Sequence, residues 1–308
     1  MTEILKIGTR GSMLALAQTE ILAGLLRARN PSLVIEIVKI VTSGDRIQDR
    51  SLSEIGGKGL FTKEIEDALS EGSIDCAVHS MKDMPTQLPQ GLEISCLLPR
   101  EDVRDAFFSP KAETLDDLPS GAVVGTSSLR RQAIVLARRP DLKVVVFRGN
   151  VDTRLKKLQD GVVDATLLAV AGLNRLGMAS RIQHILEPDV MLPAVAQGAV
   201  GIETRIGDKR VQKMLAEIHC GITELRVTAE RAFLEVMDGS CKTPLAALMG
   251  VPDSLHRARF DVLAAKPDGT DVKKATYVMK VASVHDAQSL GRHAGVEMKK
   301  ELPEGYLV

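Results

Sequence analysis

The sequence predicts an α/β protein made of two similarly built α/β domains and a small α+β domain at the C-terminal end. Three observations support this fold class. Two segments repeat one strand–turn–helix–strand pattern, a second pair of segments repeats in the same order, and the pattern changes after about residue 222. The length of 308 residues and the hydrophobic content of 44% suit two or three domains, each with its own core.

Residues 4–38 and 121–147 form the first pair of repeated segments. Each starts with a short apolar strand that ends in Gly-Thr, passes through a polar turn with Ser, and continues as an Ala/Leu-rich helix. Arg and Pro then precede a second, β-branched strand. Thr9 of the first segment aligns with Thr126 of the second, which predicts two strand–helix–strand units of the same design.

The second pair of segments follows at the same place in each half. A helix over 60–70 runs into EGSIDCAVHS from Glu71, and a helix over 152–159 runs into DGVVDATLLA from Asp160. Both read as an acid, Gly, two further residues, Asp and a buried strand. Such units can look alike by chance, but two ordered matches favour a duplication. Two such domains side by side would form a cleft, in which ligands bind beyond the carboxyl ends of the strands.

The chain after residue 221 has a different pattern. A helix over 222–236 places one apolar face together, made of Leu225, Ala229, Ala232, Phe233 and Val236. A turn from Lys266 to Gly269 joins two strands as a hairpin. These features predict a small α+β domain, with strands at 245–251, 257–265 and 274–282 and a last helix at 286–301.

The composition argues against several classes of protein. Lys plus Arg and Asp plus Glu both number 40 and aromatic residues make up 3%, which disfavours a nucleic-acid-binding protein. No apolar run reaches the roughly 20 residues of a membrane span, and the N-terminus lacks a signal-peptide pattern. We therefore expect a cytoplasmic protein without a membrane partner. The four cysteines and six histidines show no metal-ligand spacing, so no metal is expected.

Four predicted strand-to-helix loops place Ser, Thr or Gly beside cations, at 9–12, 56–59, 126–131 and 148–154. Cations in a first helical turn oppose the helix dipole at a cost of about 0.3–1 kcal/mol each. The free N–H groups at the same place favour an anion. One such loop could simply hold a solvated Arg, but four at matching places predict a bound polyanion. None has the P-loop spacing of a nucleotide-binding protein.

Asp83 is the acidic residue best placed to face a cleft. It follows the strand that ends near Val78, and Pro85 prevents a helix, so the segment between them is expected to be a loop. An ionised carboxylate there can stabilise a carbocation and transfer a proton. The alternative is that Asp83 only pairs with Lys82 or caps a turn. His79, at the buried end of the strand, is expected to support the site and not to react.

Cys241 lies in the polar loop DGSCK, where Lys242 would favour the thiolate. Cys76 and Cys96 lie in apolar strand-like segments and are expected to be structural, and Cys220 lies near a domain junction. An exposed cysteine is more often inert than catalytic, so the residues alone leave the role of Cys241 open.

Eight motifs in order resemble the porphobilinogen deaminase family, also called hydroxymethylbilane synthase. They cover residues from about 4 to 250, and they read IGTRGSMLALAQ, GGKGLFTKE, AVHSMKDMP, VGTSSLRRQ, RGNVDTR, LAVAGLNRLG, LPAVAQGAVGIE and DGSCKTPLA. The resemblance implies two duplicated domains like those of periplasmic binding proteins, plus a small α+β domain that carries a cysteine. It places these domains at 1–99 with 200–217, at 104–192 and at 221–308.

The resemblance also implies the chemistry. Such an enzyme holds a dipyrromethane cofactor by a thioether, here at Cys241, condenses four porphobilinogens head to tail and releases hydroxymethylbilane and ammonia. Asp83 matches the family's catalytic aspartate. The acetate and propionate groups of the pyrroles would bind the cationic loops. The implied cofactor contacts are Arg10, Ser12, Lys82, Ser128, Arg130, Arg131, Arg148 and Arg154, and the implied substrate contacts are Arg10, Gln18, Lys58, Arg148, Arg154, Arg175 and Gln197.

Two positions depart from the family pattern. Glu54 stands where many members carry Lys, so that cation is absent, and Ser240 stands where Gly is common.

The alternative function is a non-catalytic anion-binding protein of the periplasmic type, which would share the duplicated fold. A nucleic-acid-binding regulator is a third, less favoured class. The resemblance further implies a monomer.

Overall fold

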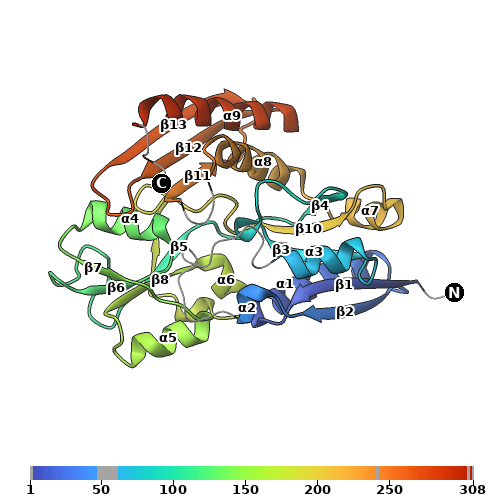
Figure 1. Cartoon of the computed structure of the whole chain (residues 1–308), viewed down its shortest axis with the longest axis horizontal. Helices are drawn as coiled ribbons and strands as arrows, with labels where there is room; N and C mark the ends of the chain where they lie inside the picture. Colours follow the sequence, from blue (N-terminus) through green and yellow to red (C-terminus); the bar gives the residue numbers. More distant parts are fainter. Residues whose placement is uncertain (1–2, 47–61, 240–242, 304–305, 307–308) are drawn as a thin grey trace. The chain divides into compact units, whose positions relative to one another are not determined.

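The computed structural model describes residues 3–46, 62–239, 243–303 and 306. The chain divides into two units. Among the described residues, unit 1 contains 3–46, 62–101 and 198–223, and unit 2 contains 102–197 together with 224 and the residues that follow it. Each unit has its own five-stranded sheet, and unit 2 carries a further three-stranded sheet (Figure 1).

Unit 1 is a mixed sheet with helices on both faces. Its strand order is β2-β1-β3-β10-β4, with β1 parallel to β2 and β3, and β10 antiparallel to β3 and β4. Apolar residues of α1 and α7 pack on one face, and Ile65 and Leu69 of α3 pack on the other. The elements are β1 (Ile4–Arg10), α1 (Met13–Arg29), β2 (Val34–Ile40), α2 (Ser43–Arg46), α3 (Lys63–Ser70), β3 (Cys76–Ser80), the 3-10 turn η1 (Met81–Asp83), β4 (Leu92–Leu97), β10 (Val200–Arg205) and α7 (Lys209–Ala216).

Unit 2 repeats this topology. Its sheet has the order β7-β6-β8-β5-β9, in which β6 is parallel to β7 and β8, and β5 is antiparallel to β8 and β9. Each position matches one in the unit 1 sheet, so β5 takes the place of β10. The elements are β5 (Asp105–Phe108), β6 (Val123–Gly125), α4 (Leu129–Arg138), β7 (Lys143–Val145), α5 (Val151–Gln159), β8 (Ala165–Ala169), α6 (Val170–Arg175), the 3-10 turn η2 (Ala179–Arg181) and β9 (His184–Leu186).

The second repeated motif shows why the two copies share residues. In unit 1, Lys6 N donates to Asp75 Oδ2 at 2.7 Å, and Asp75 N donates back to Lys6 O at 2.8 Å. In unit 2, Val123 N and Asp164 make the same two contacts at 2.7 and 2.8 Å. Each Asp therefore ties the start of one strand to its parallel neighbour. The predicted duplication is confirmed at the level of topology and of individual hydrogen bonds.

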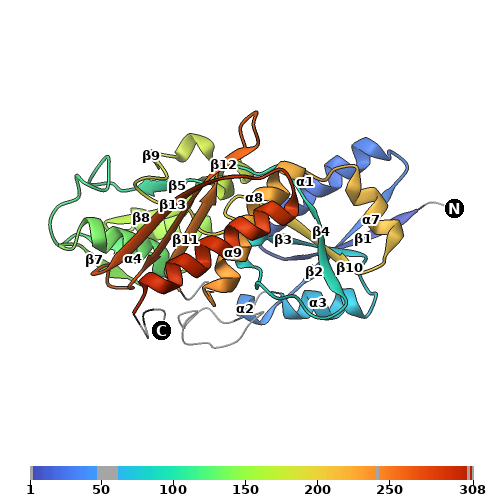
Figure 2. The same ribbon diagram turned by 90° about the horizontal axis from the view of Figure 1, so that it is seen from above.

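The predicted C-terminal elements are present as α8 (Gly221–Val236), β11 (Leu245–Met249), β12 (Arg257–Ala265), β13 (Val272–Lys280) and α9 (Val284–Glu301). The three strands form an antiparallel sheet in sequence order. Helices α8 and α9 lie side by side in both ribbon views (Figure 2), and they approach closely at two glycines. A Cβ added to Gly291 would lie 2.1 Å from Ala229 O, so only glycine fits this helix contact.

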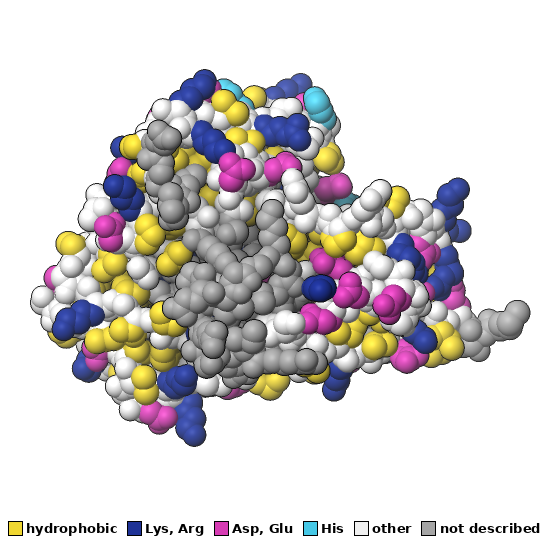
Figure 3. All heavy atoms as spheres, viewed as in Figure 1, with side chains coloured by type: hydrophobic (Ala, Val, Ile, Leu, Met, Phe, Trp, Pro, Cys, Tyr) yellow, Lys and Arg dark blue, Asp and Glu magenta, His cyan; other side chains and the backbone are white. Residues whose placement is uncertain are grey.

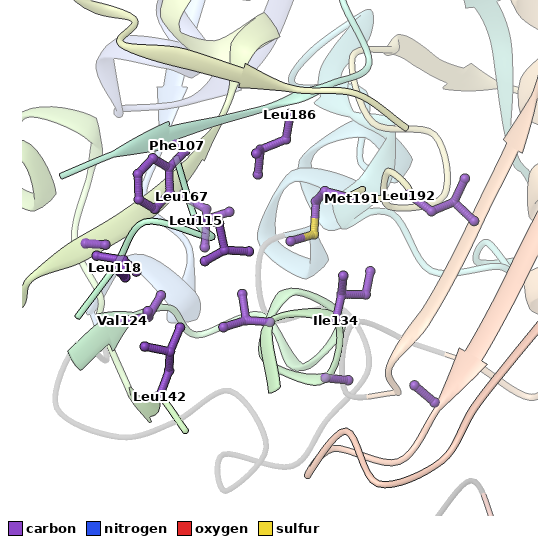
Figure 4. Packing of buried hydrophobic residues seen from close by; sticks show 14 of the residues in the cluster. Phe107, Leu115, Leu118, Val124, Ile134, Leu142, Leu167, Leu186, Met191 and Leu192 are labelled. Atoms are coloured by element: carbon purple, nitrogen blue, oxygen red, sulfur yellow. The ribbon is translucent and has the colours of Figure 1, made fainter. Parts of the chain in front are cut away.

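The main core of unit 2 joins its two sheets. Phe107, Leu167 and Ile134 are buried among residues from the five-stranded sheet, its loops and α4 (Figure 4). Ala246 of β11 and Leu263 of β12 belong to the same apolar cluster. The small C-terminal sheet therefore shares a core with residues 102–197.

The hairpin turn between β12 and β13 makes a further contact with α4. Gln132 Nε2 donates to Pro267 O at 3.0 Å. Gly269 has a φ of +73°, and a Cβ added there would lie 2.5 Å from Ala137 N. The turn thus sits directly on the helix backbone, where no side chain fits.

We therefore expect any substitution of Gly269 to destabilise the folded protein. We expect Gly269→Ala to lower the free energy of unfolding by about 3 kcal/mol, because left-handed strain adds to overpacking. Gly72→Ala is the matched control, since Gly72 has a similar φ of +77° but no atom within 4 Å of the added Cβ, and about 1 kcal/mol is expected. Urea unfolding measures both, and equal losses would show that the hairpin contact adds nothing.

The surface carries charges of both signs on the described part of the face seen in Figure 3. No helix among the described residues is long and apolar enough to cross a membrane. Within those same residues, no group of three or more His, Cys, Asp or Glu side chains could hold a metal ion.

Candidate functional site

A pocket in unit 1 brings together four of the residues implied by the family resemblance. Arg10, Ser12, Gln18 and Asp83 all line it. The pocket lies where β1 and β3 reach their carboxyl ends, the position expected for a ligand in an open α/β sheet. The remaining lining residues are Leu14, Ala15, Thr62, Val78, His79, Ser80 and Met84.

The start of α1 fixes one side of this pocket. Arg10 is the last residue of β1, and Ser12 is the N-cap of α1, whose hydroxyl accepts a hydrogen bond from Ala15 N at 3.3 Å. The first turn of α1 contains no acidic residue, so its N–H groups and dipole are left for an anion. Gln18 is 3% exposed and its amide donates to Ser80 Oγ at 2.9 Å, which holds α1 against the end of β3.

Asp83 ends a single 3-10 turn directly after β3, where the sequence predicted a loop. Met81 and Met84 on either side are buried, and Met84 N donates to Met81 O at 3.3 Å. The backbone that carries Asp83 is therefore anchored by two apolar side chains. The side chains of Lys82 and Asp83 are exposed, so a ligand can reach both.

His79 is buried at the end of β3, as the sequence predicted, and its supporting role stays a prediction. It is 6% exposed, and its Nε2 lies 3.0 Å from Oε2 of Glu203 on the neighbouring strand β10. Glu203 is completely buried and was not identified from the sequence. Its only signal is an acid inside the short strand Val200–Arg205, which begins with Val-Gly-Ile.

A second group of implied site residues lies in unit 2, around the start of α4. Ser128 is the N-cap of α4, and its hydroxyl accepts from Arg131 N at 3.4 Å. Arg130 and Arg131 are 4% and 6% exposed, and both turn inward. Arg130 Nη1 donates to Leu192 O and Arg131 Nη1 donates to Leu167 O, at 2.7 and 2.8 Å. Backbone carbonyls thus fix both guanidinium planes.

Asp105, the first residue of β5, connects this group. It accepts from Arg130 Nη2 at 2.7 Å, from Arg131 Nη2 at 2.6 Å and from Gln197 Nε2 at 3.0 Å. Burial alone would raise the pKa of Asp105, but the two guanidinium charges outweigh it and hold the pKa well below its usual range. Asp105 was not identified from the sequence, in which the cationic loops predicted a balancing anion from outside the protein. The structure shows that one internal carboxylate balances one of two arginine charges.

We call Arg130, Arg131 and Arg154 together the arginine group. Asp105 is the carboxylate that pairs with Arg130 and Arg131, so this group keeps a net positive charge. The Nε atom of each arginine is buried without a hydrogen-bond partner among the described residues. Arg154, on α5, has its pKa lowered to about 10, because burial and the nearby charge of Arg131 both disfavour the cation. Within the described chain no carboxylate makes an ion pair with Arg154. Unpaired buried donors beside like charges fit a bound polycarboxylate such as the pyrrole side chains of dipyrromethane.

The other implied residues of unit 2 lie on neighbouring segments. Arg148 follows β7, and Arg175 is the last residue of α6; both are partly buried. Gln197 is 1% exposed, and besides its bond to Asp105 it donates to Val103 O at 2.7 Å. The Nε2 group of Gln197 is therefore engaged within the protein.

Several residues that the sequence analysis singled out lie outside the part of the chain that the structure describes. These are Lys58 and Cys241, together with the departures Glu54 and Ser240. Cys76 and Cys96 are buried as predicted, and burial raises the pKa of the Cys76 thiol, so it is not a nucleophile. Cys220 is partly buried and accepts a hydrogen bond from Thr223 Oγ1 at 3.2 Å.

Solved structures of bacterial binding proteins are weakly similar to this chain. A lipoprotein from Enterococcus faecalis shares 15% identity at a TM-score of 0.44, covering 70% of this chain and 90% of that one. A putative methionine-binding lipoprotein from Bacillus subtilis shares 12% identity at a TM-score of 0.45, with coverage of 72% and 92%. The fold described above rests on the topology of the two sheets and not on these similarities.

Comparisons with family models and with curated proteins identify the family of this chain. Residues 5–213 match the porphobilinogen deaminase dipyromethane cofactor binding domain, and residues 224–300 match the C-terminal domain of the same family. The porphobilinogen deaminase of Paracoccus denitrificans is 53% identical over 98% of this chain and 96% of its own length. That of Nitrobacter hamburgensis is 52% identical over 99% and 96%. The chain therefore belongs to the porphobilinogen deaminase family.

Proposed function

We propose that this chain condenses four porphobilinogen molecules head to tail on a dipyrromethane, which is joined through a thioether to Cys241, and then releases hydroxymethylbilane by hydrolysis. Family membership over nearly the whole chain supports the reaction. The structural observation that carries the proposal is the arginine group, in which three buried Nε donors have no hydrogen-bond partner among the described residues and only Asp105 supplies an internal counter-charge. A substrate with two carboxylates on every ring supplies the anions that such a group requires.

The proposed roles divide between the two units. In unit 2, Ser128, the arginine group and Arg148 would bind cofactor carboxylates, and Arg148, Arg154, Arg175 and Gln197 would contact substrate. In unit 1, Arg10, Ser12 and Lys82 would serve the cofactor, and Arg10 and Gln18 the substrate. Lys58 is the further proposed substrate contact. Arginine suits these roles because its planar fork can bind a carboxylate through two parallel hydrogen bonds.

Asp83 is the proposed catalytic residue. In the proposed reaction, the aminomethyl C–N bond of the substrate breaks and ammonia leaves. The carboxylate of Asp83 would stabilise the positive charge that develops on the methylene carbon, where the new C–C bond then forms. The protonated amine of the substrate leaves as ammonia, and the proton lost afterwards from the attacked ring carbon passes to Asp83 and from there to the released ammonia, so atoms and charge balance. When bound, dipyrromethane supplies the first nucleophilic ring carbon. An exposed carboxylate on an anchored turn can serve every cycle in the same geometry.

We further propose three domains with the boundaries expected from the sequence, a monomeric state and a cytoplasmic location. The two-unit division groups residues 102–197 with the C-terminal segment. The shared core of Phe107, Ala246 and Leu263 supports a firm attachment of the third domain to the second.

The direct test is an intact mass measurement of the purified full-length chain. We expect a mass above the sequence value by one dipyrromethane, and we expect Cys241→Ser to remove that excess and the consumption of porphobilinogen with it. Cys220→Ser is the matched control and should keep the added mass. A bare mass in the unmodified chain, with no porphobilinogen consumed, would instead favour the anion-binding alternative.

A further inference from the structure

A turn in unit 2 holds a backbone conformation that its residue disfavours. Gln197 N donates to Ala194 O at 3.0 Å and closes a turn over residues 194–197. Ala196, in the third position of this turn, has a φ of +58°, where glycine is usual because a Cβ is strained in the left-handed region. Such strain persists in a folded protein only where the surrounding contacts hold it in place.

Burial sets Ala196 apart from other residues with this conformation. Among the described residues, the other two non-glycine residues with positive φ are Asp238 and His256. Both are exposed, and Asp and His are residue types that tolerate the left-handed region. Ala196 is completely buried, so neither solvent nor its own side chain can satisfy its backbone N–H. Another group of the protein has to accept that hydrogen bond.

The accepting group is the side chain of Glu230, on α8. Its Oε2 accepts from Ala196 N at 2.7 Å, and its Oε1 accepts from the N–H of Met249, the last residue of β11, at 3.1 Å. Glu230 is completely buried, and all of these residues belong to unit 2. Arg226, one helical turn earlier, donates from Nε to Met249 O at 2.8 Å. Glu230 therefore joins α8 to the turn, whereas this bond of Arg226 joins α8 to β11 alone.

The turn connects Glu230 to the arginine group. Gln197 directly follows Ala196, and its Nε2 donates to Asp105 Oδ1 at 3.0 Å. Asp105 in turn accepts from two members of the arginine group, at 2.7 and 2.6 Å. If Ala196 left the left-handed region, the backbone of Gln197 would be reoriented and its amide would lose the bond to Asp105. A continuous series of bonds thus runs from Glu230 to the guanidinium groups.

We propose that Glu230 is a positioning residue for substrate binding: by holding Ala196 in its left-handed conformation, it keeps the amide of Gln197 on Asp105 and the arginine group in place for a carboxylate of porphobilinogen. This inference rests on the proposed function. Glu230 is buried and acts only through its neighbours, so its loss should weaken substrate binding more than it slows the chemical steps.

The activity test compares two substitutions one turn apart on α8. Glu230→Met keeps the length of the side chain but cannot accept either hydrogen bond. We expect KM for porphobilinogen to rise about tenfold and kcat to change less than about threefold, because the lost contact serves the ground state and the transition state alike. Arg226→Met is the matched control: it removes a bond between α8 and β11 and leaves the turn bond intact, so its KM should stay within about twofold of that of the unmodified chain.

A second substitution should reverse the effect. Glycine adopts a φ of +58° without strain, so Ala196→Gly should keep the turn in place when the carboxyl group is gone. We expect Glu230→Met combined with Ala196→Gly to restore KM to within about threefold of the unmodified chain, and Ala196→Gly alone to match it. A merely structural role of Glu230 would lower the amount of active enzyme and give no change in KM for glycine to reverse.

Three results would each overturn the proposal: an unchanged KM in Glu230→Met, a raised KM that Ala196→Gly does not restore, or an equal rise in Arg226→Met. Circular dichroism establishes that each variant is folded. If Glu230→Met does not fold, Ala196→Val tests the same link with Glu230 intact. A β-branched residue is disfavoured at positive φ, so the turn should shift and KM should rise about tenfold; a KM within about twofold of the unmodified chain would reject the link.

Hydrogen exchange tests the turn without any activity. In the full-length chain, Ala196 N–H is bonded to Glu230 and Gln197 N–H to Ala194. A peptide over residues 192–199 should take up deuterium about tenfold faster in Glu230→Met than in Arg226→Met. Equal rates would contradict the proposal, whether or not the chain consumes porphobilinogen. Absence of turnover in the unmodified chain, by contrast, would reject the proposed function.

Discussion

Asp83→Ala should reduce the turnover of porphobilinogen by about 10²–10⁴-fold while leaving the free energy of unfolding within about 0.5 kcal/mol of its original value. The two effects separate because Asp83 is exposed, whereas the turn that carries it is held by the buried Met81 and Met84. Removing the carboxylate takes away the proposed proton acceptor and the charge that stabilises the methylene cation, and it leaves the anchoring side chains in place.

Steady-state assays and urea unfolding on the same preparations provide the measurement. Asp83→Asn should behave like Asp83→Ala, since an amide cannot take up the proton. Asp160→Asn, an exposed Asp at the end of α5, is the control that should keep full activity. Turnover of Asp83→Asn within tenfold of the unmodified enzyme would exclude Asp83 as the acid/base group.

Asp105→Ala should be among the most destabilising single substitutions in unit 2, with a loss of about 3–5 kcal/mol. Asp105 is fully buried and balances Arg130 and Arg131, whose guanidinium groups are nearly as buried. Without it, both cations would remain in the interior, where the charge of Arg131 also acts on Arg154, and Gln197 Nε2 would lose one acceptor. We also expect this variant to lose the added dipyrromethane mass, because the arginine group would no longer be held in position.

Urea unfolding at neutral pH measures this loss, and Asp116→Ala is the control. Asp116 forms an exposed ion pair with Arg138, so a change below about 1 kcal/mol is expected. The pH dependence gives a second check. Since the folded-state pKa of Asp105 is depressed, its contribution is complete above the ordinary value of 3.8 and is lost only as the pH falls through the lower folded value. A loss in Asp105→Ala no greater than in Asp116→Ala would contradict the role of Asp105 in holding the arginine group.

Much of the architecture is readable from local sequence, for identifiable reasons. Asp75 and Asp164 each accept a hydrogen bond from a backbone N–H at the start of a neighbouring strand within their own copy. The repeat is therefore visible in the sequence. The apolar face of α8 and the Lys266–Gly269 turn are likewise local patterns of spacing and turn chemistry. The elements of the C-terminal segment were predicted for this reason.

What the sequence did not reveal depends on contacts between distant segments. Asp105 contacts Arg130 only when β5 and α4 have packed together. The four-residue strand DAFF contains no local pattern that predicts two cations beside its Asp. Glu203 is 124 residues from His79, and an acid in a buried strand has no local marker of its partner. The assumption that cations at helix starts await an outside anion was therefore incomplete, since part of the counter-charge lies in the protein itself.

The position of β10 between β3 and β4 has a consequence for how the protein emerges from the ribosome. β4 ends at Leu97, but the strand that must separate it from β3 begins only at Val200. For the time needed to translate the intervening hundred or so residues, the N-terminal sheet is left with a gap in its interior, and two strands expose unsatisfied backbone groups. The N-terminal sheet therefore cannot be completed until β10 has been synthesised, and we expect a truncated product that ends before Val200 to aggregate.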